Sequence, residues 1–248
     1  MIADPAFYLV AVVAVLIVGV SKGGFGGGLG IVGVPLMSLV VAPVEAAAIM
    51  LPILCLMDLV GLVHYRRIWD RRIMAIIAPA SLLGILAAAL TVSLVDQRWM
   101  RLLIGLIAVV FTLDHWLRPK RRDRPPPGDR AGWFWAGVSG YTSFLSHAGG
   151  PPLNVYLLPQ RLDKTVMAGT TVVYYTIVNY AKLPAYWALG TLDLRNMATA
   201  LVLLPLAPLG IWLGVWLHRR VDEALFYRLA YLFVFLTGLK LLWDGVAG

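Results

Sequence analysis

A glycine-rich stretch near the start of the chain restricts what the chain can fold into. Residues 21–30 read Ser-Lys-Gly-Gly-Phe-Gly-Gly-Gly-Leu-Gly, and apolar runs stand on both sides. Each glycine weakens a helix by roughly 1 kcal/mol relative to alanine. If the flanking runs cross a membrane, this broken backbone survives only where protein buries it or where it lines a watery cavity. The stretch is therefore a candidate transport site, with Lys22 beside it.

The composition indicates a membrane protein. Hydrophobic residues make up 60% of the 248 residues and charged residues only 14%, whereas soluble domains carry about 25% charged residues. The formal charge is +8, but the basic residues gather in short loops between apolar runs. The positive-inside rule explains that arrangement, so we expect no nucleic-acid partner. The single Cys55 lies within an apolar run, which argues against a disulfide framework or a zinc site. We expect no metal and no cofactor.

The apolar runs predict an all-α polytopic membrane protein with about 8–10 helical segments. Segments 30–42 and 150–160 are short, so we expect broken or re-entrant half-helices near 23–42 and 146–160. The ten predicted segments are 6–22, 30–42, 45–64, 73–95, 99–117, 132–147, 150–160, 165–188, 196–217 and 224–243.

Loop charges orient these segments. Basic residues concentrate at 64–72, 118–130, 160–164 and 218–220, which alternating segments place on one side. The positive-inside rule assigns that side to the cytoplasm and puts both termini outside, in the periplasm. We therefore expect a multi-pass protein of the cell inner membrane. The basic, proline-rich stretch 118–131 is predicted to be a cytoplasmic linker between a first repeat, 1–117, and a second, 132–248.

The two halves resemble each other weakly. Gly19-Val20-Ser21 recurs as Gly137-Val138-Ser139, and Leu83-Gly84-Ile85 recurs as Leu209-Gly210-Ile211. Five segments per half is an odd number, so the second half starts on the opposite side and the repeats have inverted topology. Paired broken helices in such repeats mark the binding site of secondary transporters. A chance resemblance between glycine-rich apolar stretches is the alternative interpretation.

The counterpart of the first glycine stretch is Ser-Phe-Leu-Ser-His-Ala-Gly-Gly-Pro-Pro-Leu-Asn at 143–154. Two prolines suit the first turn of a new helix, and the glycines before them supply unusual dihedral angles. A half-helix is therefore predicted to begin near residue 150, with free N–H groups that attract an anion. Ser146, His147 and Asn154 are placed to add donors.

Ionisable residues at membrane depth are functional candidates by default. Lys22 either contacts an anion, pairs with Asp58 or extends to the interface. Lys182 is either a second cation directed at a cavity or part of an ion pair. Asp58 either carries a coupling proton or neutralises a lysine, and Asn179 occupies roughly its position in the second repeat. The predicted substrate site comprises Ser21, Lys22, Gly26, Gly27, Ser146, His147, Gly149, Gly150, Asn154, Asn179 and Lys182, with Asp58 as a coupling or ion-pair residue.

Three stretches, Ser21 to Gly28, His147 to Pro152 and Asn179 to Lys182, resemble the TauE/SafE sulfite-exporter family. That resemblance covers nearly the whole chain. It implies a bacterial inner-membrane carrier for sulfite, sulfoacetate or another sulfur-containing anion.

We therefore expect a secondary transporter, an exporter working by alternating access, with a small anion and the lipid bilayer as partners and a homo-oligomer as one possible assembly. The alternatives are an anion channel with a glycine-lined pore and a carrier of small carboxylates. The chain lacks P-loop, HExxH, CxxC and Ser/His/Asp motifs, so we expect no enzyme.

Overall fold

The computed structural model describes residues 1–2, 4–24, 30–65, 67–117, 126–218, 220 and 223–247. Every regular element in these residues is helical, which confirms the predicted all-α class. The α-helices are α1 (Pro5–Gly24), α2 (Gly33–Met37), α3 (Pro43–Tyr65), α4 (Arg71–Thr91), α5 (Gln97–Leu117), α6 (Asp129–Ser146), α7 (Gly150–Leu157), α8 (Lys164–Ala188), α9 (Leu194–Leu203), α10 (Leu206–His218) and α11 (Glu223–Ala247).

Four helical stretches among the described residues are long and apolar enough to cross a membrane. They are Pro5–Gly23, Pro43–Val63, Arg71–Leu94 and Leu194–Leu217, of 19, 21, 24 and 24 residues. At 1.5 Å per residue, about 20 residues span the roughly 30 Å of hydrocarbon in a bilayer. These stretches confirm a multi-pass membrane protein.

Two of the predicted segments form helices too short to cross a bilayer, as expected, and a third segment is divided into two helices. α2 has five residues and α7 has eight, so neither reaches across a bilayer. α7 carries proline in its first turn, as predicted. The segment predicted at 196–217 is confirmed as one apolar stretch long enough to cross a membrane, Leu194–Leu217, but it is divided into two helices: α9 ends at Leu203 and α10 begins at Leu206. Pro205 stands between them, and a proline has no N–H with which to continue a helix.

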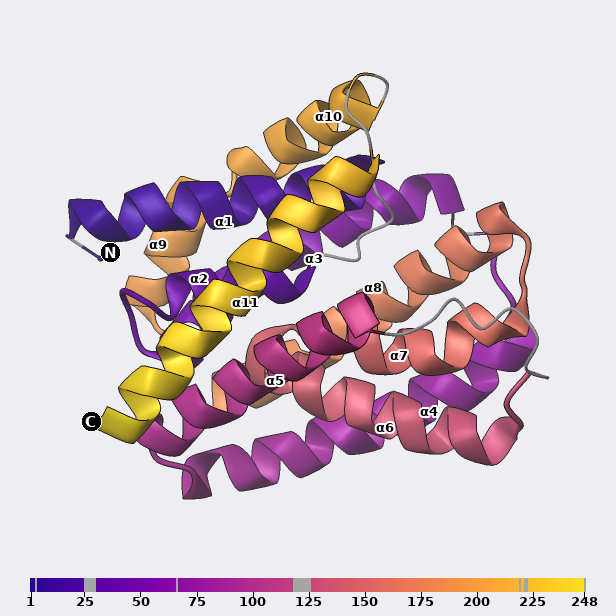
Figure 1. The fold of residues 1–248 in the computed structure, drawn as a ribbon, viewed down its shortest axis with the longest axis horizontal. Coiled ribbons are helices and arrows are strands. Elements are labelled where there is room, and N and C mark those ends of the chain that lie inside the picture. The colour runs from indigo at the N-terminus through magenta and orange to yellow at the C-terminus, as the bar shows by residue number, and fades with distance from the viewer. Residues whose placement is uncertain are drawn as a thin grey trace.

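The closest helix pairs each join the first half of the chain to the second. α1 packs on α10, α4 on α6, α5 on α11 and α3 on α8 (Figure 1). The repeated motifs equate α1 with α6 and α4 with α10. The α1–α10 and α4–α6 pairs are therefore counterparts, as a two-fold internal repeat requires. This pairing supports the inverted repeat, which stays a prediction.

Glycines of the repeated motifs lie where these helices touch. A Cβ atom on Gly19 of α1 would lie 2.9 Å from Cα of Gly210 on α10. A Cβ on Gly84 of α4 would lie 2.9 Å from the carbonyl carbon of Gly137 on α6. Small residues let membrane helices approach until their backbones touch. The glycines of the two repeated motifs thus lie where the two halves of the chain pack against each other.

Both chain termini lie at the same end of the molecule (Figure 1). The start of α4 and the connection from α7 to α8 lie at the opposite end. This arrangement agrees with termini that share one side of the membrane. Which side faces the cytoplasm stays a prediction from the loop charges.

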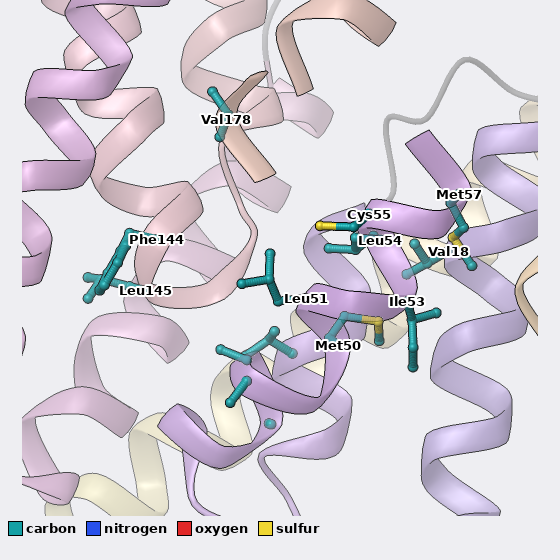
Figure 2. Packing of buried hydrophobic residues seen from close by; sticks show 14 of the residues in the cluster. Val18, Met50, Leu51, Ile53, Leu54, Cys55, Met57, Phe144, Leu145 and Val178 are labelled. Atoms are coloured by element: carbon teal, nitrogen blue, oxygen red, sulfur yellow. The ribbon is translucent and has the colours of Figure 1, made fainter. Parts of the chain in front are cut away.

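α3 runs through the interior and contacts both halves. Its residues from 46 to 51 are all buried. Figure 2 shows Leu51 pointing from α3 toward the side on which Phe144 and Leu145 end α6. The same helix carries Asp58, so its apolar packing fixes a carboxylate inside the protein.

Candidate functional site

The two helix breaks meet in the interior. A Cβ on Gly30, just before α2, would lie 3.7 Å from the carbonyl oxygen of His147, just after α6. Ile31 and Val32 pack in one buried cluster with Ala148. Gly26 and Gly27 of the first break lie outside the described residues. The breaks predicted as partners from the repeat are therefore neighbours in space.

His147 ends α6 in an unusual conformation. Its φ angle is 54°, in the left-handed region that favours glycine. The N–H groups of His147 and Ala148 donate to the carbonyls of Ser143 and Thr142, at 3.0 and 3.4 Å, in the pattern that commonly closes a helix. A non-glycine residue in this region costs on the order of 1–3 kcal/mol and persists where its surroundings hold it.

Lys182 from α8 reaches the end of α6 and is fully buried. Its Nζ lies 3.1 Å from both the carbonyl oxygen and the Oγ of Ser143, and 2.7 Å from Nδ1 of His147. The other ring nitrogen, Nε2, lies 2.9 Å from the carbonyl oxygen of Ala47 on α3. An ammonium group only donates, so Nδ1 accepts and the ring proton on Nε2 donates to Ala47.

No carboxylate pairs with Lys182 among the ion pairs of the described residues. An isolated charge removed from water is strongly unfavourable unless a counter-charge or hydrogen bonds compensate it. Here only neutral acceptors surround the ammonium. The end of α6 therefore holds a buried lysine amine among neutral acceptors.

A second polar cluster joins α1, α3 and α8. Lys22, in the last turn of α1, forms an ion pair with Oδ1 of Asp58 on α3. Asn179 of α8 donates from Nδ2 to Oδ2 of the same carboxylate at 2.5 Å. Asp58 is 4% exposed. Of the interpretations left open for Lys22, this structure forms the ion pair, and Asp58 and Asn179 make the shared polar layer.

The two clusters are neighbours along α8. Asn179 and Lys182 are three residues apart on α8, so they share a helix face, about one turn from each other. Cations from both halves of the chain, at the ends of two broken segments, thus point into one buried region.

A chain of buried hydroxyl groups supports the second break. The Tyr174 hydroxyl lies 2.6 Å from Oγ of Ser81 and 2.8 Å from Oγ of Ser139. Ser139 donates to the carbonyl of Gly149 at 2.6 Å, and Ser81 donates to that of Ala136 at 2.7 Å. This network links α4, α6 and α8 to the backbone just before α7. Sequence reasoning missed it, although Ser139 belongs to a repeated motif.

Three other predicted residues, Ser146, Gly149 and Gly150, contribute to hydrogen bonding and packing at the second break. Ser146 donates back to the carbonyl of Thr142 at 3.4 Å, so its hydroxyl serves its own helix. A Cβ on Gly149 would lie 2.9 Å from the carbonyl oxygen of Ser139, and one on Gly150 would lie 3.2 Å from the Tyr175 hydroxyl. These two glycines leave room for close packing at the break.

Ser21 and Asn154 are the remaining predicted site residues in the described part of the chain. Ser21 is buried on α1 beside Lys22. Asn154 is half-buried on α7, one turn after its start. Within the described residues, no hydrogen bond joins the Asn154 side chain to Lys182 or His147. Two residues that do make such contacts were not predicted as site residues. Ser143 contacts Lys182, and the carbonyl of Ala47 contacts His147. Ser143 stands one turn before His147, and this spacing was the available signal.

Comparison with known proteins gives one match. The model of the family described as sulfite exporter TauE/SafE matches residues 11–241. No curated protein and no solved structure gave a significant match. The matched range contains most of α1, all of α2 to α10, most of α11 and every site residue predicted from the sequence. The chain therefore belongs to the sulfite exporter TauE/SafE family.

Proposed function

We propose that this protein is a secondary transporter that exports a small sulfur-containing anion, such as sulfite or an organosulfonate, by alternating access. Membership of a sulfite-exporter family supports a membrane carrier of this class. The observation that carries the proposal for this chain is Lys182. Its ammonium group is fully buried at a helix break and has no carboxylate partner among the described ion pairs.

The surroundings of Lys182 suit an oxyanion. Its three donors now go to two atoms of Ser143 and to His147. An anion seated between the breaks would accept from the ammonium in their place, with charge-assisted bonds roughly twice as strong as neutral ones. Lys22 approaches from the first half, where Asp58 holds it. Hydrogen-bond donors from both halves of the chain would thus replace the water molecules around the anion.

We assign the protein to the bacterial inner membrane with both termini in the periplasm. The loop charges support this orientation, and the shared end of the two termini is compatible with it (Figure 1). The proposed partners are the small anion and the lipid bilayer, with a homo-oligomer as one possible assembly.

Flux into proteoliposomes tests the proposal. Purified protein is reconstituted, and uptake of sulfite, methanesulfonate and acetate is measured against protein-free vesicles. Lys182→Met should abolish uptake of the sulfur anions. Lys240→Met is the matched control, because Lys240 is an exposed lysine that pairs with Asp244 at the end of α11. Equal uptake by the two variants would refute the proposed site.

The same preparation separates the alternatives. A carrier saturates and shows exchange of internal for external anion, whereas a channel gives unitary currents in a planar bilayer. Unitary currents would show that the protein is a channel and not a carrier. Faster uptake of acetate than of sulfite and methanesulfonate would show that the substrates are carboxylates and not sulfur anions.

A further inference from the structure

We propose that Asp58 sets the valence of the transported anion, restricting the carrier to anions with a single negative charge. This inference rests on the proposed transport function and adds a selectivity rule to it. It follows from a count of the charges that the described residues bring to the site, and it identifies the substrate as a monovalent oxyanion such as hydrogensulfite or a sulfonate.

The Lys182–His147 contact holds at most one positive charge. Nζ and Nδ1 are 2.7 Å apart, so one of these atoms donates and the other accepts. Both groups cannot be charged, because two donors would then face each other. A neutral amine also donates to a neutral ring, so the contact itself allows zero or one positive charge, and an anion bound beside the pair favours one. With an anion in the site, the pair therefore contributes +1 whichever atom holds the proton.

The Lys22–Asp58 pair contributes no net charge. Oδ1 of Asp58 accepts from Lys22 and Oδ2 accepts from Asn179, so both oxygens act as acceptors, which is the role of an ionised carboxylate. Neighbouring acids include the Cys55 thiol and the hydroxyls of Tyr175 and Tyr180, which are uncharged in the protonated form typical of neutral pH. The site as a whole holds +1.

A buried site with one positive charge is complementary to one negative charge. A monovalent anion makes the occupied site neutral. A divalent anion of the same shape leaves a negative charge uncompensated where Asp58 is 4% exposed and Lys182 is fully buried. Uncompensated charge is strongly disfavoured away from water. Removing the Asp58 charge raises the site to +2 and reverses this preference.

Three variants separate charge from position. Asp58→Asn keeps the size of the side chain and gives a site of +2. The double variant Lys22→Gln with Asp58→Asn removes both members of the ion pair and returns the site to +1. Asp244→Asn is the matched control, because Asp244 also pairs with a lysine but lies at the exposed end of α11.

The probes are methanesulfonate and sulfate, which are both tetrahedral and differ in charge by one. Uptake of each is measured in proteoliposomes with the membrane potential clamped at zero by potassium and valinomycin. We expect wild type and Asp244→Asn to favour methanesulfonate at least about tenfold, which corresponds to about 1.4 kcal/mol. Asp58→Asn should lower that ratio at least about tenfold, and the double variant should restore it.

Three outcomes overturn the inference alone: a wild type that carries sulfate as fast as methanesulfonate, a double variant that keeps the ratio of Asp58→Asn, or a wild type that carries sulfite and neither probe. Uptake of no sulfur anion at all would refute the proposed function itself. If Asp58→Asn is not recovered as folded protein, the wild-type ratio and the double variant, which has no unpaired charge at this pair, still decide.

Discussion

The α4–α6 contact offers a sharp test of the packing, because two glycines in it are predicted to respond in opposite ways to the same substitution. A Cβ on Gly84 would overlap the carbonyl oxygen of Gly137 and lie 2.9 Å from its carbonyl carbon and 3.0 Å from the amide nitrogen of Tyr141. These are backbone atoms and cannot rotate away. A Cβ on Gly137 would lie 3.7 Å from the carbonyl oxygen of Ala80, at ordinary van der Waals distance.

The cost of Gly84→Ala follows from these distances. Ordinary contact begins near 3.4 Å, whereas this Cβ would lie 2.0 Å from the carbonyl oxygen of Gly137, so α4 and α6 must separate by about 1 Å or more in a closely packed interior. That movement also stretches the bond from Ser81 to the carbonyl of Ala136, now 2.7 Å. Overpacking costs typically about 1–3 kcal/mol, and alanine recovers up to about 1 kcal/mol in helix propensity. We therefore expect a net loss of about 1–2 kcal/mol.

Gly137→Ala keeps the propensity gain without the clash, so its stability should be unchanged or about 1 kcal/mol higher. The chain's nine tryptophans provide a fluorescence signal for thermal unfolding in detergent. A difference of about 2 kcal/mol between the variants corresponds to an unfolding midpoint roughly 4–8 °C lower for Gly84→Ala than for Gly137→Ala. Equal midpoints, or a lower midpoint for Gly137→Ala, would show that this helix contact is not as close as described.

Three further predictions concern the site and the topology. Asn179→Leu removes the donor to Oδ2 of buried Asp58 and should lower the free energy of unfolding by about 1–3 kcal/mol. The same thermal assay measures this change, and unchanged stability would contradict it. Ser139→Ala frees the carbonyl of Gly149 and should speed amide hydrogen exchange in α7. Tyr174→Phe should affect that exchange less, since Ser139 keeps its bond to Gly149, and the reverse order would refute the proposed support of the break. Tags at the two termini should be cleaved by protease from the same side of sealed vesicles, with cleavage from opposite sides contradicting the shared end seen in Figure 1.

The helices were largely predictable because the length of an apolar run is a local property. The segments predicted at 45–64 and 165–188 appear as α3 and α8 with ends shifted by two residues or fewer. The short segments were predicted from proline and glycine, whose effects on the backbone are also local. The interruption at Pro205 was missed because run length alone was used across 196–217, although the proline was the signal.

The site was predictable only in part. Ionisable residues at membrane depth require partners, so the contacts of Asp58 with Lys22 and Asn179 were among the interpretations that the residues left open. The carbonyl oxygens of Ser143 and Ala47 were not predictable, because every residue carries a carbonyl and residue type does not mark one. The Tyr174 network needs three helices at one crossing, and that information lies in tertiary packing alone.

The pairing of α1 with α10 and α4 with α6 changes what can move during transport. The four helix pairs in closest contact each join one half of the sequence to the other, so neither half packs as a separate unit. Under the proposed alternating access, the bodies that move would be mixed pairs, held at their glycine contacts. It also follows that the peptide connection between the halves is not what keeps them together. Fragments 1–117 and 126–248, produced in the same cell, should assemble into an active carrier, while either fragment alone leaves its glycine faces without a partner.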